Sequence, residues 1–322
     1  MNDLIKEMFV RAFKNRYLEK LPDAASISWD TPTMAFTTDS YVVDPLFFPG
    51  GDIGKLAVCG TVNDLAVSGA TPLYLSAGFI IEEGLKISVL KRIVQSMAAE
   101  AQKAGVKIVT GDTKVVPRGK ADKLFINTAG VGCMHACVKE AFISDKIKNG
   151  DKILVNGHLG EHAIAILSAR NEMHFESEVL SDCACLNGLL DKILQKHKRV
   201  CFMRDITRGG LATILCELAS ALELGLEIYE ERVPVSTSVK GACDLLGYDP
   251  LYLANEGKVM IIADAAESED ILRTMQNHPL GEDARIIGEV VQDHPGMLIC
   301  HTSIGSKRIV NMLSGEMLPR IC

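Results

Sequence analysis

The chain has 322 residues, of which 48% are hydrophobic and 23% charged, which predicts a soluble globular protein of two domains. The formal net charge of −7, with no lysine- or arginine-rich run, argues against nucleic acid as a partner. No segment has the length and apolarity of a membrane span, and "MNDLIKEMF" is not a leader pattern, so we expect a cytoplasmic protein. The ten cysteines follow no regular framework and are expected to be free thiols.

The first part of the chain has the pattern of an α+β domain, predicted to span residues 1–145. Apolar and β-branched runs predict strands, and longer runs with helical spacing predict helices. The strands are expected at 35–43, 72–81, 106–116 and 123–132, and the helices at 52–68 and 87–104.

A polar, turn-rich stretch, "SDKIKNGDKILVNG" at 144–157, is the predicted boundary. The second domain, 146–312, is expected to be a mixed sheet with helices on one face. Residues 313–322 are predicted to form a mobile tail that ends in Cys322. The expected strands lie at 152–157, 200–206, 226–231, 258–264 and 284–291, and the expected helices at 211–222 and 269–278.

Acidic residues stand beside polar or glycine residues in four short motifs. Mg²⁺ prefers hard oxygen ligands and phosphates need close backbone amides, so this pattern indicates a site for a nucleotide triphosphate. Each motif alone is as well explained by a turn or a helix cap. The motifs are "TTDS" with Asp39, "VNDLA" with Asn63 and Asp64, "GDTK" with Asp112 and Lys114, and "RDITRGG" with Asp205 and Arg208.

The segment "PGGDIGKL" is not a P-loop. The Walker pattern needs a glycine and a hydroxyl residue where this chain has Pro49 and Leu56. The glycines are instead expected to make a turn that opens the helix at 52–68.

Several segments together resemble the HypE family of hydrogenase-maturation factors. They are the run 36–70, which contains "SYVVDPLFFPGG", together with "VTGDTKVVPRG", "FINTAG", "RDITRGG", "LANEGK", "IIGEV" and the terminal "PRIC". The acidic motifs are shared with the wider superfamily of aminoimidazole ribonucleotide synthetase and selenophosphate synthetase. In contrast to the family, this chain opens without a short Gly-rich segment, and "GEHA" replaces Gly-Asp-His-Gly, so His162 is assigned no catalytic role.

The resemblance implies an ATP-dependent lyase. A HypF-like carbamoyltransferase would load a carbamoyl group on Cys322, and the enzyme would dehydrate it with ATP and Mg²⁺ to a thiocyanate. The cyano group would then pass through a HypC–HypD-like complex to the iron of a nickel–iron hydrogenase. Relatives pair their first-domain sheets, so a homodimer with the nucleotide near its interface is expected.

The resemblance also assigns roles to individual residues. Glu256 would be the base for the amide nitrogen, and Lys114 would neutralise the transferred phosphoryl group. Asp112 would lie near the phosphates. The magnesium ligands would be Asp23, Asp39, Asp64 and Asp205, and further nucleotide contacts would come from Asp39, Lys55, Asn63, Asp64, Gly111 and Thr113.

The terminal cysteine suits a carrier, because nine extended residues from Ser314 reach roughly 30 Å. Two other functions stay open: a selenophosphate-synthetase-like enzyme, and a non-catalytic carrier of a modified thiol. The close pairs Cys133/Cys137 and Cys183/Cys185 lack a second ligand pair at zinc-finger spacing and are expected to be buried free thiols.

Overall fold

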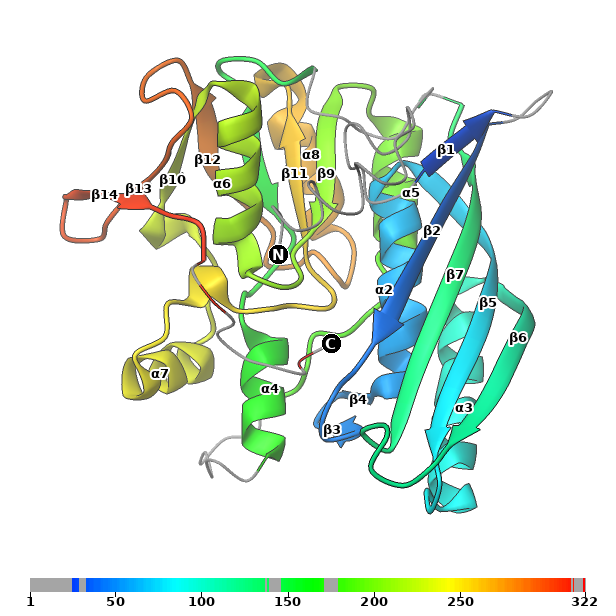
Figure 1. The fold of residues 1–322 in the computed structure, drawn as a ribbon. Coiled ribbons are helices and arrows are strands. Elements are labelled where there is room, and N and C mark those ends of the chain that lie inside the picture. Colours follow the sequence, from blue (N-terminus) through cyan, green and yellow to red (C-terminus); the bar gives the residue numbers. More distant parts are fainter. Residues whose placement is uncertain are drawn as a thin grey trace.

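The computed structural model describes residues 25–28, 33–136, 138, 146–170, 179–313, 315 and 321, which are built around two β-sheets (Figure 1). A five-stranded sheet has the order β1-β2-β7-β5-β6, and a seven-stranded sheet has the order β14-β13-β10-β12-β8-β11-β9. Among the described residues, no helix has the length and apolarity needed to cross a bilayer.

The five-stranded sheet contains all the strands predicted in the first part of the chain. β5 and β6 are parallel, and the other neighbours are antiparallel. A short hairpin of β3 (Phe47–Phe48) and β4 (Gly51–Asp52) precedes the first helix. The strands of the sheet are β1 (Ala25–Ser28), β2 (Thr33–Tyr41), β5 (Ala70–Glu82), β6 (Lys107–Val116) and β7 (Leu124–Met134).

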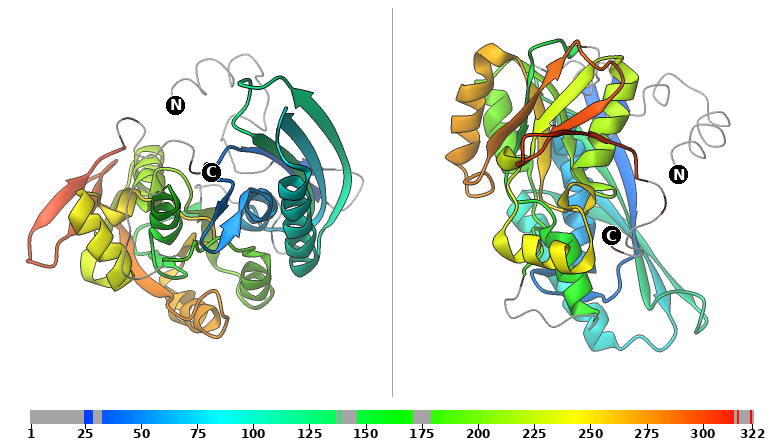
Figure 2. Two further views of the ribbon diagram at one scale, coloured as in Figure 1. Left: turned by 90° about the horizontal axis from the view of Figure 1, so that it is seen from below. Right: turned by 90° about the vertical axis from the view of Figure 1, so that its left-hand side faces the viewer.

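Two helices cover one face of this sheet. α2 (Ile53–Val67) begins after Asp52, whose carboxylate accepts hydrogen bonds from the Gly54 and Lys55 amides, and almost all of its residues are buried. α3 (Ile87–Ala104) is amphipathic and ends at Gly105, in the left-handed conformation. Figure 2 shows both helices between the curved sheet and the rest of the molecule, and no helix of the described residues covers the opposite face.

The seven-stranded sheet holds the strands predicted beyond residue 150 and two more. All five residues of β11 are buried, so both faces of the sheet are covered at its centre. The strands are β8 (Lys152–Val155), β9 (Val200–Asp205), β10 (Gly225–Tyr229), β11 (Val259–Ala263), β12 (Arg285–Val291), β13 (Leu298–His301) and β14 (Lys307–Val310).

The prediction of helices on one face of this sheet is wrong. α6 (Gly210–Leu222) lies on one face, where the Cys216 thiol donates to the Val310 carbonyl oxygen. α8 (Ala265–Gln276) lies on the other, beside β8 and β12 (Figure 1). Sequence periodicity also missed α4 (Glu161–Ala169), α5 (Asn187–Lys196), α7 (Thr237–Leu246) and the 3₁₀ turns η3 (Glu230–Arg232) and η4 (Pro250–Tyr252).

The two sheets share a core through α2. This helix contacts β2, β5 and β7 on one side and β9 and α5 on the other. Val58 of α2, Ile164 of α4 and Leu253 belong to one cluster of buried apolar side chains. The fold is therefore a two-domain α+β arrangement in which one buried helix lies between the sheets.

Candidate active site

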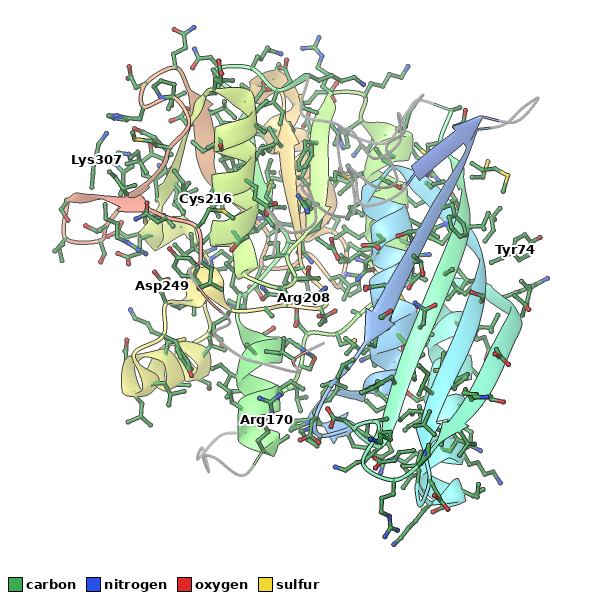
Figure 3. All side chains as sticks on the ribbon, in the orientation of Figure 1. Tyr74, Arg170, Arg208, Cys216, Asp249 and Lys307 are labelled. Atoms are coloured by element: carbon green, nitrogen blue, oxygen red, sulfur yellow. The ribbon has the colours of Figure 1, made fainter. Side chains whose placement is uncertain are left out.

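A small pocket between the two sheets brings together the acidic residues of three separate motifs. Asp39 comes from β2, Asp64 from α2 and Asp205 from the end of β9, and Glu256 lies in the loop before β11. Arg208 lines the same pocket, and Figure 3 shows it between the two halves of the molecule. The remaining lining residues are Ser40, Tyr41, Gly60 and Thr207.

Close packing of β2 against α2 forms the N-terminal wall of the pocket. The Thr37 hydroxyl donates to Asp64 Oδ2 at 2.8 Å, and the Tyr41 hydroxyl lies 3.3 Å from that of Thr61. A Cβ atom on Gly60 would lie 2.2 Å from the Tyr41 hydroxyl oxygen. Only glycine at this position allows the buried tyrosine to reach the helix.

Asp182 fixes the loop that carries Glu256. Its carboxylate accepts hydrogen bonds from the backbone amides of Glu256 at 3.2 Å and Gly257 at 3.1 Å, and it lies 3.7 Å from Lys258 Nζ. A Cβ atom on Gly257 would lie 2.0 Å from the Asp182 carbonyl oxygen. The sequence analysis did not single out Asp182, because nothing in its local pattern marks a contact with residues 74 positions away.

The Glu256 side chain is suited to accept a proton. It is 3% exposed, and its Oε1 atom has no hydrogen-bond partner among the described residues. Burial, and then the charges of Asp182, Asp205 and Asp39, raise the pKa of Glu256 well above its usual range, while Arg208 acts in the opposite direction. A carboxyl group with a raised pKa can act as a base near neutral pH.

The pocket also fits a hard divalent cation. Its four carboxylates are the oxygen donors that Mg²⁺ prefers, and such a concentration of negative charge needs a compensating cation. Asp39, Asp64 and Asp205, from three different elements, are the residues that could hold it.

Asn63, which was predicted to contact the nucleotide, bonds the main chain of the second half of the molecule through its side chain. Its Nδ2 donates to the carbonyl oxygens of Ala184 at 3.1 Å and Glu256 at 3.3 Å, and its Oδ1 accepts from the Leu186 amide at 2.7 Å. Because its side chain is 1% exposed and used in these three bonds, Asn63 is a positioning residue.

The "GDTK" motif lies apart from the pocket within one chain. Gly111, Asp112, Thr113 and Lys114 belong to the edge strand β6, three strands from β2, which is about 14 Å at the usual strand spacing. Asp112 and Lys114 pair with Gly78 and the exposed Ile80 of β5. Directly paired residues share a face, so both point away from α2 and α3.

Three further predicted residues lie elsewhere or outside the described residues. Lys55 Nζ donates to the Gly50 carbonyl oxygen at 2.9 Å, and Lys55 does not line the pocket. The predicted magnesium ligand Asp23 and the predicted carrier Cys322 lie outside the described residues. The residue before that cysteine, Ile321, is described, and only 4% of it is exposed.

His162 holds the backbone of Ile321. The imidazole is fully buried, with Nε2 2.7 Å from the Ile321 carbonyl oxygen and Nδ1 2.8 Å from the Ser181 hydroxyl. A carbonyl oxygen can only accept, so Nε2 carries the proton. Burial lowers the pKa of His162, so the ring is neutral and Nδ1 accepts from Ser181. The Cys183 amide then donates to the Ser181 hydroxyl at 3.1 Å, and every polar group in the chain of bonds is satisfied.

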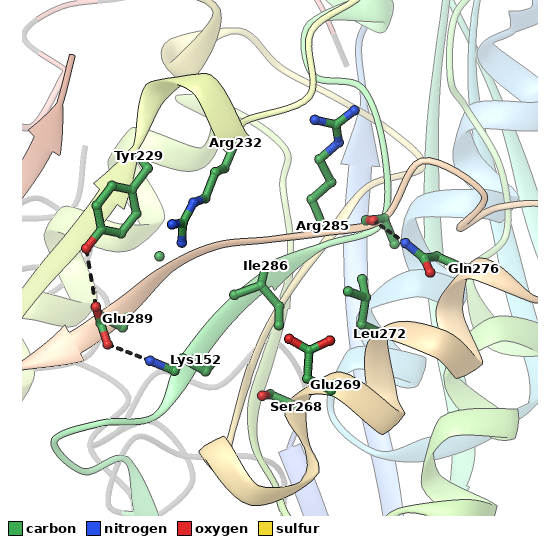
Figure 4. A pocket seen from close by; sticks show the side chains of 12 residues that line it. Lys152, Tyr229, Arg232, Ser268, Glu269, Leu272, Gln276, Arg285, Ile286 and Glu289 are labelled. Atoms are coloured by element: carbon green, nitrogen blue, oxygen red, sulfur yellow. Dashed lines mark hydrogen bonds and ion pairs between the residues drawn. The ribbon is translucent and has the colours of Figure 1, made fainter. Parts of the chain in front are cut away.

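A larger pocket of about 420 Å³ contains none of the predicted site residues (Figure 4). It lies between α8 and the strands β8, β10 and β12. Glu289 accepts from the Tyr229 hydroxyl at 3.3 Å and pairs with Lys152 Nζ at 2.5 Å. The smaller pocket, which holds the predicted carboxylates, is therefore the candidate active site.

Two protein families match the chain. Residues 22–134 match the AIR synthase related protein, N-terminal domain, and residues 148–300 match the corresponding C-terminal domain. The carbamoyl dehydratase HypE of Cupriavidus necator is 49% identical over 320 residues, which are 99% of this chain and 91% of the relative. The carbamoyl dehydratase HypE of Escherichia coli is 47% identical and aligns over 100% of this chain and 96% of the relative.

Solved structures are similar over the same length. The chain superimposes with a TM-score of 0.91 on a structure of a HypE–HypF complex, with 47% identity, covering 96% of this chain and 99% of that one. A structure of HypE in complex with ATP gives a TM-score of 0.87 and 46% identity, with coverage of 100% and 96%. A thiamine monophosphate kinase from Aquifex aeolicus, 17% identical with a TM-score of 0.69 and coverage of 94% and 97%, shares the fold.

Glu256→Gln is expected to stabilise the protein in the absence of nucleotide and Mg²⁺. The folded-state pKa is raised, so over the range between the ordinary and the raised pKa the folded protein keeps a proton that the unfolded chain has lost. Stability therefore falls as pH rises through that range, and the neutral amide avoids this loss. We expect a gain of roughly 1–3 kcal/mol in the free energy of unfolding at slightly alkaline pH, vanishing below the ordinary glutamate pKa.

Thermal unfolding over a series of pH values measures this difference. Glu282→Gln, at an exposed position, is the matched control and should leave the unfolding temperature unchanged. Equal stability of Glu256→Gln and the wild type across the whole pH series would show that burial does not raise the pKa of Glu256 in the folded protein.

Proposed function

The chain belongs to the HypE carbamoyl dehydratase family, among the AIR synthase related proteins, and on this premise we propose that it converts an S-carbamoyl group on Cys322 to a thiocyanate in the pocket around Glu256. It is an ATP-binding enzyme of hydrogenase maturation. One observation carries the proposed site. Two consecutive residues, Ser181 and Asp182, contact the tail anchor and the loop of the proposed base. Ser181 is hydrogen-bonded to His162, which bonds the Ile321 carbonyl oxygen, and Asp182 accepts from the backbone amide of Glu256.

ATP with Mg²⁺ would supply the phosphoryl group that makes the carbamoyl oxygen a good leaving group. Asp39, Asp64 and Asp205 are the residues proposed to hold the cation. In the net reaction, the carbamoyl thioester and ATP give the thiocyanate, ADP and phosphate. The carbon keeps its bond to sulfur, loses its oxygen to phosphate and gains two further bonds to nitrogen.

The residues of the chain would supply proton transfer and charge balance. Glu256, with its raised pKa and its unpartnered Oε1, would accept a proton from the carbamoyl nitrogen as the oxygen leaves. Arg208 lines the same pocket and would offset negative charge that develops there. His162 would act as a positioning residue, because its ring bonds the main chain before the reacting cysteine and is not itself required to move a proton.

Cys322 would be loaded and unloaded by other proteins. The solved HypE–HypF complex supports a HypF-like carbamoyltransferase as the donor. We propose a HypC–HypD-like iron-carrying complex as the acceptor of the cyano group, and a cytoplasmic location, in which the eight free thiols of the described residues would stay reduced.

A second copy of the chain would complete the site. The face of the five-stranded sheet away from the helices exposes Phe36, Tyr74 and Ile80, and Figure 3 shows Tyr74 pointing outward from it. Asp112 and Lys114 lie on this same face. A homodimer formed through it would cover the apolar residues and carry Lys114 to the partner's nucleotide.

Cys322→Ala and Glu256→Gln should separate loading from dehydration. Without the sulfur, Cys322→Ala should accept no carbamoyl group but bind Mg-ATP with wild-type affinity, since the acidic pocket is unchanged. Glu256→Gln should accept the carbamoyl group and lose at least about 100-fold in the rate of dehydration. Intact-protein mass spectrometry with a carbamoyl donor system, with and without ATP, detects both steps. Dehydration in Cys322→Ala, or a modification mapped to another cysteine, would refute this carrier.

Mixed dimers test whether Lys114 acts across the interface. Lys114→Ala and Glu256→Gln homodimers should both be inactive. After random mixing, half of the dimers carry one site with both native residues, so about a quarter of the wild-type activity should return. The control mixture of Glu256→Gln with Asp64→Ala, two residues of one pocket, should recover nothing. If the first mixture also stays inactive, Lys114 does not act in the partner's site.

His162→Phe should release the tail while keeping an aromatic ring of similar size. The lost hydrogen bond should increase the rate of Cys322 alkylation about 3- to 10-fold, and Ser181→Ala should act in the same direction because it removes the donor to Nδ1. Peptide mapping after timed exposure to iodoacetamide measures the rate. His294→Phe, at an exposed turn, is the control. Equal rates in His162→Phe and the wild type would mean that His162 does not hold the tail.

A further inference from the structure

Two sulfur atoms and a carboxylate converge behind the acidic pocket. The thiols of Cys59, on α2, and Cys185, just before α5, lie 3.5 Å apart. The Cys59 thiol also donates to Glu100 Oε1, on α3, at 3.8 Å. One ligand atom from each of the three residues lies within 4.8 Å of the other two. Glu100 is 41 positions and Cys185 126 positions from Cys59 in the sequence.

The spacing matches the edges of a tetrahedral metal site. With metal–sulfur bonds of about 2.3 Å and metal–oxygen bonds of about 2.0–2.2 Å, tetrahedral geometry separates the ligand atoms by roughly 3.5–3.8 Å. A disulfide needs sulfur atoms about 2.05 Å apart, so these two thiols would have to move together to form one. The three residues supply three of the four ligand atoms of such a site.

We propose that Cys59, Glu100 and Cys185 bind a thiophilic divalent cation of the Zn²⁺ class. Two thiolates select such a cation over Mg²⁺, which prefers oxygen ligands, so this site differs in kind from the acidic pocket. A water molecule would take the fourth position. Both cysteine thiols would lose their protons on binding.

The surroundings of the cluster agree with a cation site. Glu100 is 6% exposed, and the one hydrogen bond to its Oε1 comes from a thiol, a weak donor. Its Oε2 pairs with Lys103 at 3.2 Å, which orients the carboxylate. Cys59 is fully buried, whereas Cys185 is partly exposed and gives a cation a route from solvent.

The fold supplies ligands that cannot be found along the sequence. Cys185 has no second cysteine at the usual zinc-ligand spacing, and α2 and α3 bring Cys59 and Glu100 to it. The cation would also connect the two parts of the molecule, because α2 and α3 belong to the first sheet's layer and Cys185 precedes α5 of the second (Figure 1).

Titration of the reduced full-length protein with Co²⁺ tests this site, because thiolate ligation gives a charge-transfer band and tetrahedral geometry gives intense visible bands. We expect the charge-transfer band to saturate at one Co²⁺ per chain, and Zn²⁺ to displace that ion. Cys185→Ser and Glu100→Gln should each weaken binding at least about tenfold. Cys133→Ser, a thiol of similar exposure on β7, and Cys322→Ala should leave the bands unchanged.

Two results would overturn the proposal. One is a wild-type spectrum that persists in both Cys185→Ser and Glu100→Gln, which would place the ion elsewhere. The other is a reduced wild type that takes up no Co²⁺ but forms a Cys59–Cys185 disulfide under mild peroxide, which would make the pair a redox pair. Circular dichroism shows whether each variant is folded. Because Cys185 is partly exposed, Cys185→Ser should disturb the fold less than Glu100→Gln, whose site is buried.

Discussion

Three hydrogen bonds of Asn63 connect the first half of the molecule to two segments of the second, the segment before α5 and the loop of Glu256. The amide bonds the main chain at Ala184, Leu186 and Glu256, and the next residue, Asp64, lines the acidic pocket. A buried asparagine that is fully bonded tolerates little displacement, because each lost bond leaves an unpaired polar group. The position of α2 therefore helps to set the separation between Asp64 and Glu256, the proposed base.

The proximity of four carboxylates has a cost that the rest of the fold must offset. Burial and mutual repulsion destabilise the ionised pocket before a substrate enters it. Almost all residues of α2 are buried, and the helix packs so closely that a Cβ on Gly54 would lie 2.5 Å from the Ile93 carbonyl oxygen of α3. The helix therefore contributes apolar burial around that pocket. A stable frame of this kind holds the carboxylates in place for the cation that we propose to compensate them.

The sequence predicted well what depends on local pattern. The amphipathic helix α3 was predicted at its observed bounds. Three of the four acidic motifs supplied carboxylates that share a pocket, those of Asp39, Asp64 and Asp205, whereas Asp112 lies on β6. The short helices α4 and α7 were not predicted, because nine or ten residues give too little helical periodicity to recognise. Asp182, the tail contact of His162 and the Cys59 cluster could not be predicted, because each depends on partners far apart along the chain. The face occupied by Lys114 follows from strand register, which the local pattern leaves undetermined.

His162 Nε2 donates to a peptide carbonyl oxygen, that of Ile321. A hydrogen bond to the main chain does not depend on the chemical state of the side chain that follows it. In the reaction that we propose for Cys322, this bond would hold substrate and product alike, so it would give the cycle no direction. Direction would come from the phosphoryl donor and from the proteins that compete for the tail.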